Sequence, residues 1–150
     1  MSLIVLLDAG PLGMVTNPKA TALTLECTKW LKNLLLKGTK VAVAEISDYE
    51  ARRELLRAGK SAGLARLDAL KGSLEYLSLT TETMLRAADF WATVRKKGKP
   101  TASDAALDGD VILAAQATIL AASGESVIVA TTNVKHLDLF IDAKEWQAIV

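Results

Sequence analysis

The feature that most restricts the fold is a series of short, almost wholly apolar runs separated by longer segments with helical spacing. The first run, Leu3–Leu7, ends at the carboxylate of Asp8. A run of this length and character fits a strand that is buried on both faces. Three further runs are expected as strands, although one of them includes Glu75 and Ser78, and a last short strand is expected near Trp146–Val150. The three runs are Val41–Ala44, Leu74–Leu79 and Val127–Ala130.

The segments between these runs predict helices. We expect them to begin near Pro18, at Ser47, near Leu64, at Thr80 or Thr81, and at Asp110 after a loop over residues 101–109. Strands that alternate with helices predict a parallel sheet covered on both sides. The sequence therefore predicts one domain over residues 1–150, of the α/β class: a three-layer α/β/α sandwich with a central, mainly parallel sheet of four to five strands.

Composition excludes several kinds of protein. Hydrophobic residues make up 51% and charged residues 23% of the chain, which suits a globular domain with a substantial core. Because Cys27 and His136 are the only residues of their types, neither an internal disulfide nor a zinc site of Cys and His is available. The start lacks a basic region and reaches Asp8 quickly, so we expect neither a signal peptide nor a membrane span, and a cytoplasmic location.

The net charge of +1 hides an uneven distribution. Residues 29–99 carry 15 Lys or Arg against 8 Asp or Glu, whereas residues 100–150 carry 2 against 7. A basic middle beside an acidic remainder suits a protein that attracts a polyanion and holds cations nearby. Charges scattered by chance over solvated helix faces would give similar blocks, and this alternative stays open.

Polar residues are placed where a parallel sheet binds its ligands, beyond the carboxyl ends of the strands. Asp8 follows the first strand and Asn133 the fourth, while Glu50 lies about one turn into the helix after the second strand. Asp108 and Asp110 stand at the start of the Ala-rich helix. Five oxygen-bearing side chains from distant segments are thus expected at one edge of the sheet.

Each of these residues also has a local explanation. They can serve as turn residues (Asp8, Asn133), as the capping-box partner of Ser47 (Glu50), as a helix N-cap (Asp108) or as a match to the helix dipole (Asp110). Local chemistry does not require them to share one edge, however. Clustered carboxylates repel one another unless a hard cation such as Mg²⁺ or Mn²⁺ lies between them. Such an ion activates water, and phosphodiester hydrolysis is the natural reaction.

Four motifs carry a resemblance to a known family: Leu6–Leu12, Ile46–Leu55, Asp108–Ala117 and Val127–Leu137. In order and spacing they resemble the PIN domain, and within it the VapC-type toxins of toxin–antitoxin pairs. The resemblance covers nearly the whole chain. It implies a divalent-metal-dependent endoribonuclease that acts on an RNA substrate, with Mg²⁺ or Mn²⁺ as cofactor, an antitoxin protein as partner and a homodimer as assembly.

The resemblance also implies roles for single residues. Asp8, Glu50 and Asp110 match the first three acids of the family and are the expected catalytic residues, with Glu54 left open as an alternative to Glu50. Two further metal ligands are implied beside them. These are Asp108, an extra acid, and Asn133, which stands where many members have Asp.

Other polar and aromatic residues receive weaker expectations. Arg53 and Arg57 follow Glu50 on one helix and are expected to bind RNA phosphates, with an antitoxin groove as the competing use. Asp48 and Asp104 are expected at solvated positions, and His136 is expected to be structural rather than catalytic. Cys27 is expected to pack in the core, and the three tryptophans to make core or dimer contacts (Trp30, Trp91, Trp146). Thr131 or Thr132 is expected either to bind phosphate or to form hydrogen bonds at the strand end.

Two other functions compete with the nuclease. One is a catalytically weak PIN-like module that binds RNA or protein without turnover. The other is a phosphoryl-transfer or receiver domain with Asp8 as the phosphorylated nucleophile. The second fits less well, because the neighbours Leu7 and Gly10 supply no additional acid.

Overall fold

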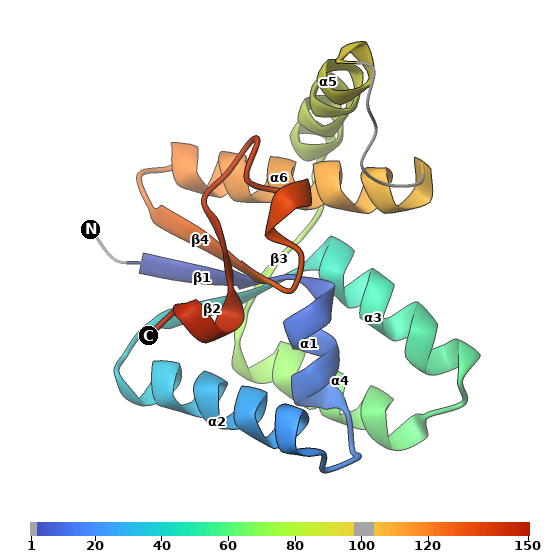
Figure 1. Ribbon diagram of the computed structural model, residues 1–150, viewed down its shortest axis with the longest axis vertical. Helices are drawn as coiled ribbons and strands as arrows, with labels where there is room; N and C mark the ends of the chain where they lie inside the picture. The colour runs from blue at the N-terminus through green and yellow to red at the C-terminus, as the bar shows by residue number, and fades with distance from the viewer. Residues whose placement is uncertain (1–2, 98–103) are drawn as a thin grey trace.

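The computed structural model describes residues 3–97 and 104–150, and in this part of the chain the predicted α/β architecture is present (Figure 1). A five-stranded sheet has the order β3-β2-β1-β4-β5, with every neighbouring pair parallel. The strands are β1 (Leu3–Leu7), β2 (Lys40–Ala44), β3 (Glu75–Leu77), β4 (Ser126–Thr131) and β5 (Ala143–Glu145). The helices are α1 (Ala9–Thr16), α2 (Ala22–Leu36), α3 (Glu45–Arg57), α4 (Ser61–Ser73), α5 (Thr81–Lys96) and α6 (Asp104–Ala122), with short 3₁₀ turns at η1 (Val134–His136) and η2 (Trp146–Ala148).

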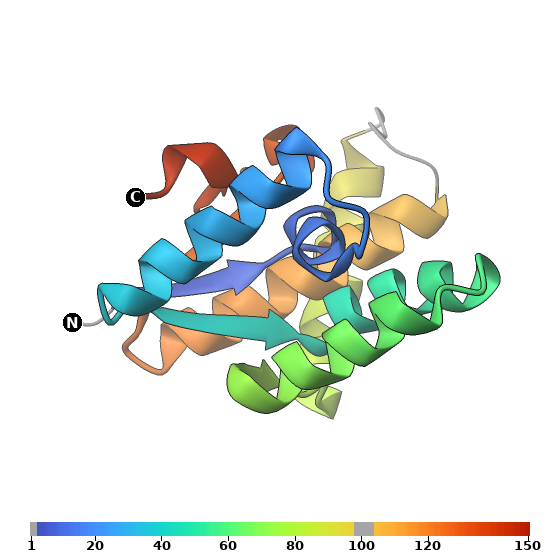
Figure 2. The same cartoon turned by 90° about the horizontal axis from the view of Figure 1, so that it is seen from below.

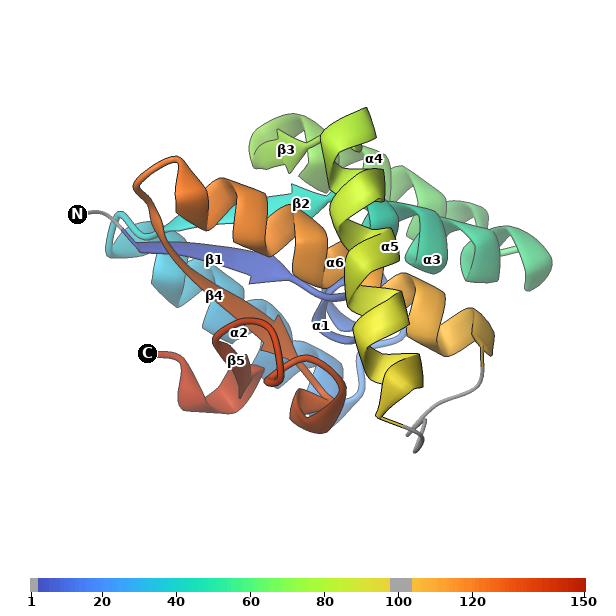
Figure 3. The same cartoon turned by 90° about the horizontal axis from the view of Figure 1, so that it is seen from above.

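The central strand β1 is buried on both faces, as its unbroken apolar sequence predicts. Val5 and Leu7 pack into a core shared with α1, α2 and α4, whereas Ile4 and Leu6 pack into a second core shared with α6. This alternation follows from the two-residue period of a strand. Figure 2 shows α2 and α4 on one side of the sheet, and Figure 3 shows α6 across the other side with α5 packed outside it. The three-layer prediction is therefore confirmed.

The segment after β1 is a helix, where the sequence predicted only a turn. Asp8 caps α1, since its Oδ1 accepts a hydrogen bond from the first helical N–H at 2.7 Å. Pro11 fits because it lies in the first turn, where the backbone N–H has no helical partner. The next helix also begins differently, since Thr21 caps α2 in a capping box and Pro18 lies outside it.

The predicted start of α3 was wrong, and the difference bears on the site. The helix begins at Glu45 without a side-chain cap, so Ser47 lies inside it, buried and without a hydrogen bond to its hydroxyl. Glu50 therefore is not the capping-box partner of Ser47. A capping role therefore does not explain the presence of Glu50 at this position.

The start of α6 also differs from the prediction. Residues 104–109, expected as part of a loop, are helical, while residues 101–103 of that loop lie outside the described residues. Asp108 is consequently not an N-cap, and Asp110 lies in the second turn of the helix. Both acids project from a continuous helix whose position is fixed by its packing on the sheet.

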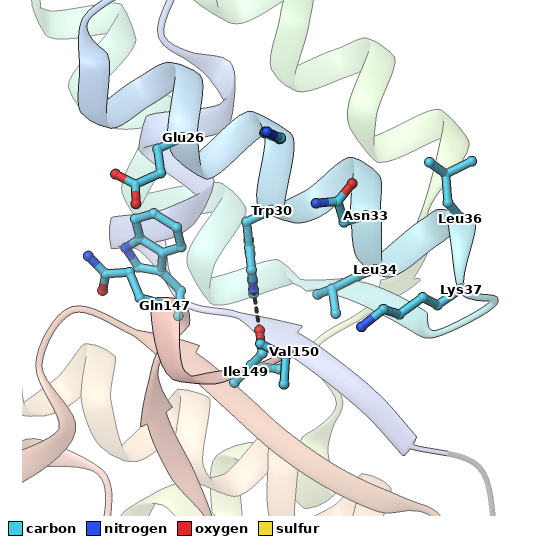
Figure 4. Close-up of a pocket in the computed structure, with 11 residues that line it drawn as sticks. Glu26, Trp30, Asn33, Leu34, Leu36, Lys37, Gln147, Ile149 and Val150 are labelled. Carbon is cyan, nitrogen blue, oxygen red and sulfur yellow. Dashed lines mark hydrogen bonds between the residues drawn. The ribbon is translucent and has the colours of Figure 1, made fainter.

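The C-terminal segment forms β5 at Ala143–Glu145, and the strand predicted at Trp146–Val150 is replaced by the η2 turn. Trp146 is buried and packs edge-on against Trp30, with ring centroids 5.5 Å apart. Trp30 Nε1 also donates a hydrogen bond of 2.7 Å to the Ile149 carbonyl, beside a cavity of about 480 Å³ between α2 and the C-terminus (Figure 4). The expected packing role of these two tryptophans is confirmed.

Two further expectations can be judged from burial. Cys27 is fully buried in the core against α1, as expected, whereas Trp91 is 38% exposed on α5 and does not belong to the core. Within the described residues, no helix is both long and apolar enough to cross a membrane.

Candidate active site

The candidate site lies at the carboxyl ends of the adjacent strands β1 and β4, where the chain continues from β1 to β2 toward one edge of the sheet and from β4 to β5 toward the other. Ligands of open α/β sheets bind at such switch points. The register pairs Leu7 with Ala130, which brings the following residues, Asp8 and Thr131, side by side. Thr131 Oγ1 donates a hydrogen bond of 2.7 Å to Asp8 Oδ2. The carboxylate of Asp8 is thus held by two hydrogen bonds, one from the backbone N–H of Ala9 and one from the buried hydroxyl of Thr131.

Three carboxylates at this edge have raised pKa values, and burial is the largest cause for each. Burial raises the pKa of Asp8 above its ordinary value, although hydrogen bonds from Thr131 and the α1 backbone oppose the shift. Burial raises the pKa of Glu50 to about 7, and the charges of Asp8 and Asp110 add to this rise. The pKa of Asp110 rises to about 6, also first through burial, with Asp8 adding to it. The side chains therefore lie in a site that disfavours negative charge without a cation.

His136 joins this group, which sequence reasoning did not expect. Its Nδ1 lies 3.1 Å from Asp110 Oδ2 and 3.1 Å from Asn133 Nδ2. The ring nitrogen carries either a proton or a lone pair, so it can donate toward Asp110 or accept from Asn133, but not both at once. Asp110 Oδ2 is buried and has no hydrogen bond of acceptable geometry, which leaves His136 Nδ1 as its one close polar neighbour in the described chain.

The donor set suits a hard divalent cation. Asp8, Glu50 and Asp110 offer only oxygen ligands, and a positive ion would lower their raised pKa values. Asp110 Oδ2 is buried without a hydrogen bond, which leaves it able to bind an ion. Within residues 3–97 and 104–150, however, no three acidic, histidine or cysteine side chains are already gathered into a metal cage. Mg²⁺ needs no such cage, since it keeps several waters and is usually held by one or two carboxylates.

Two glycines allow close approaches at this edge. A Cβ at Gly109 would overlap Glu50 Oε2, and a Cβ at Gly10 would lie 2.7 Å from Thr132 Oγ1. These glycines let α6 and α1 come close to side chains of the site. Sequence reasoning missed this role for Gly109, whose position between Asp108 and Asp110 was the available signal.

The other two predicted ligands, Asp108 and Asn133, are exposed. Asp108 is exposed and lines a small hollow with Tyr49 and Arg53, and it is not among the charges that shift the pKa values of the three carboxylates. Asn133 is exposed; its side-chain Nδ2 lies 3.1 Å from His136 Nδ1, and its backbone N–H donates a hydrogen bond of 2.9 Å to Thr131 Oγ1. The structure thus brings Asp8, Glu50 and Asp110 together and leaves Asp108 and Asn133 at the margin.

The basic residues of α3 differ in their partners. Arg57 forms an ion pair with Glu54, so this glutamate is turned toward a cation and does not join Glu50. Arg53 instead lies over the ring of Tyr49, at 5.1 Å from the ring centroid. Beside them a cavity of about 460 Å³ opens between α1 and α3, lined by Glu50 and Arg57 among others.

Asp48, expected to be solvated, is buried with 5% exposure. Its carboxylate contacts Arg52 at 3.0 Å and Lys71 at 3.5 Å, and it accepts a hydrogen bond of 3.0 Å from Tyr76. These contacts join α3 to α4 and β3, which makes Asp48 a structural residue. The side chain of Asp104 lies outside the described residues.

Comparison with known proteins gives a fold but no relative in sequence. No protein-family model and no curated protein matches the chain. Solved structures do match. One is VapBC2 from Rickettsia felis bound to a DNA fragment from its promoter, with a TM-score of 0.71 and 16% identity over 95% of this chain and 98% of that chain. Another is VapBC-1 from nontypeable Haemophilus influenzae, with a TM-score of 0.68 and 15% identity over 96% of this chain and 98% of that chain. A third is DNA-bound VapBC from Salmonella typhimurium, with a TM-score of 0.62 and 18% identity over 96% of this chain and 98% of that chain.

This chain has the fold of those VapBC chains. The likeness extends over nearly the full length on both sides, as expected from the resemblance to the PIN domain. The strand order, with β1 at the centre, differs from the 2-1-3-4-5 order of receiver domains. The receiver alternative is therefore excluded on topology.

Proposed function

We propose that this protein is a PIN-domain endoribonuclease of the VapC toxin type, which hydrolyses RNA phosphodiester bonds with Mg²⁺ or Mn²⁺. The observation that carries the proposal is the position of Asp8, Glu50 and Asp110 at the carboxyl edge of the sheet, where burial raises the pKa of each and the charge of Asp8 adds to the rise at the other two. The shared fold with VapBC chains supports it. Carboxylates with raised pKa values at one edge of a sheet are typical of a functional site.

Asp8, Glu50 and Asp110 would hold the metal ion. When bound, a divalent ion supplies a water of lowered pKa and offsets the negative charge that develops at the phosphoryl group. Thr131 and the α1 backbone orient Asp8, and the ring of His136 lies next to the carboxylate of Asp110. With a pKa of about 7 in the metal-free site, Glu50 can also hold or release a proton near neutral pH.

The direct test is cleavage of single-stranded RNA by the purified full chain. Activity should require Mg²⁺ or Mn²⁺ and should fall when Ca²⁺ replaces them, because calcium prefers longer bonds and a looser geometry. Glu50→Gln should abolish cleavage, whereas the matched variant Glu54→Gln should retain it, since Glu54 is exposed and paired with Arg57. Full activity in excess chelator would contradict the metal mechanism.

The proposal includes partners. VapBC structures are complexes, so we infer an antitoxin protein for this chain, and a homodimer as its assembly. Co-purification with the product of a neighbouring small gene and the mass of the complex in solution would test both. A lone monomer at micromolar concentration, with no such neighbour encoded, would contradict this part and leave the hydrolytic part standing.

A second candidate is a PIN-like module that binds RNA without turnover. Asn133 favours it, because an uncharged amide next to His136 stands where an acid would strengthen metal binding. Asn133→Asp separates the two. If this variant gains both Mn²⁺ affinity and cleavage over a silent parent, the parent is a binding module; if the parent already cleaves, the nuclease proposal holds.

A further inference from the structure

Tyr49 is an exposed aromatic side chain directly before Glu50. It is 56% exposed, although rings of this size usually bury much of their surface. Arg53 lies over one face of the ring. Within the described residues, Arg52 and Arg57 form ion pairs with carboxylates, whereas Arg53 forms none. The charge of Arg53 lowers the pKa of Glu50 and Glu54, but no carboxylate of the described chain lies within ion-pair distance of its guanidinium, which can therefore still bind an anionic ligand.

These two side chains line a hollow of about 210 Å³ between α3 and α6, together with Glu50, Asp108 and Gly109. The hollow is smaller than pockets for drug-sized ligands, which measure roughly 300–1,000 Å³. It combines an aromatic surface, a cation and a pair of acceptor oxygens, and it shares Glu50 with the carboxylate group. A ligand portion that enters it therefore lies next to the proposed reaction centre.

We propose that this hollow is a nucleotide subsite, in which one unstacked base of single-stranded RNA stacks on Tyr49 while Arg53 binds a backbone phosphate. The inference rests on the proposed function and names its substrate class more closely. Aromatic rings accept any base, because every base has a π-face, and a guanidinium pairs with phosphate through charge-assisted hydrogen bonds.

Asp108 gives the subsite a base preference. Its carboxylate is exposed on the α6 wall of the hollow and accepts hydrogen bonds only. Guanine presents two adjacent donors, N1–H and the N2 amino group, on its Watson–Crick edge, whereas uracil flanks its N3–H with carbonyl oxygens that repel a carboxylate. Guanine is therefore the favoured base and uracil the least favoured.

RNA binding without cleavage tests the subsite. The full chain with Asp8→Asn serves as parent, and its affinity for labelled single-stranded oligonucleotides that differ at one guanine or uracil is measured by fluorescence anisotropy. Tyr49→Ala should weaken binding by about tenfold, in line with the loss of one stacked base, and Tyr49→Phe should restore most of it. Leu56→Ala is the matched control, since Leu56 is 60% exposed on the same helix and outside the hollow. Asp108→Asn should reduce the preference for guanine.

The outcomes separate this inference from the proposed function. If Tyr49→Ala weakens RNA binding, the subsite is supported whether or not the wild type cleaves RNA. A wild type that binds RNA but does not cleave it would contradict only the proposed hydrolysis. If Tyr49→Ala binds RNA as tightly as its parent, the subsite is overturned. This holds also if the variant loses affinity for a protein partner instead. A parent that binds no RNA overturns both, and equal losses in Tyr49→Ala and Leu56→Ala overturn the stacking.

Discussion

Two acids of α3, Asp48 and Glu50, stand two residues apart and have opposite surroundings. Asp48 faces α4 and β3, where Arg52, Lys71 and Tyr76 satisfy it. Glu50 faces α6 and α1, where Asp8 and Asp110 repel it. Successive positions on a helix differ by about 100°, so two such residues project in nearly opposite directions. Asp48 is a buried carboxylate held by cations within ion-pair distance and stabilises the fold, whereas Glu50, whose pKa Arg53 lowers less than burial raises it, belongs to a group that favours a bound cation.

The sharpest way to break this contrast is to remove charge from the unsatisfied group. Asp8→Asn and Asp110→Asn should each lower metal-dependent RNA cleavage by about a hundredfold or more, because each removes a metal ligand. Stability should stay equal or rise by about 1 kcal/mol, since repulsion and burial of charge are relieved. Cleavage assays and thermal unfolding of the same samples check both halves, and wild-type cleavage by both variants would show that the site lies elsewhere.

The reverse outcome is expected for the satisfied acid. Asp48→Ala should lower the free energy of unfolding by about 2–3 kcal/mol, less than for a fully buried ion pair because Arg52 and Lys71 remain partly exposed. Asp68→Ala is the control, since this carboxylate is 63% exposed where it contacts Arg52, and it should cost less than about 1 kcal/mol. Denaturant titration measures both. Equal costs would mean that burial does not distinguish Asp48.

Gly109→Ala tests the close packing of α6 against Glu50. The new methyl group would overlap Glu50 Oε2, and the flexible side chain can move away, so we expect a stability loss below about 1 kcal/mol. Cleavage should fall by about tenfold or more, because the displaced carboxylate no longer reaches its position. Gly72→Ala, where a Cβ meets no atom, is the matched control for adding a methyl group to a helix. Unchanged cleavage in Gly109→Ala would place Glu50 outside the reaction.

The smallest expected effect is on the pH dependence of the metal-free protein. The pKa values of Glu50 and Asp110 are raised in the folded state to about 7 and about 6, above their ordinary values of 4.5 and 3.8. Their contribution to stability is therefore present below the ordinary values and is lost as the pH rises through about 6 to 7. Thermal unfolding in chelator should show a decline from about pH 5 to about pH 8 that flattens in Glu50→Gln. Added Mn²⁺ should restore stability most strongly at the upper end, and an identical slope in wild type and variant would contradict the shifted pKa of Glu50.

The sequence by itself determined the layers and the edge at which the site lies. Leu3–Leu7 is predicted and observed with the same bounds, because only a strand buried on both faces accommodates an unbroken apolar run. The ends of α2 and α3 were also predictable, since Gly38 and Gly59 adopt the positive φ angles, 83° and 67°, that favour glycine after a helix. Asp8 follows from the same logic, because the end of a central parallel strand defines the binding edge.

Only the tertiary structure decided which polar residues act together. The sequence predicted a solvated Asp48, which was wrong, and a structural His136 without its contact to Asp110, because the partners of these residues come from other elements. Local signals act within about one helical turn or one strand pair, which is why they failed at α1, where Gly10 and Pro11 are typical of a turn but are held in a helix by packing. Burial, charge repulsion and pKa depend on groups far apart in the chain, such as Thr131, whose hydroxyl donates a hydrogen bond to Asp8. Such contacts between distant residues form only once the sheet has formed.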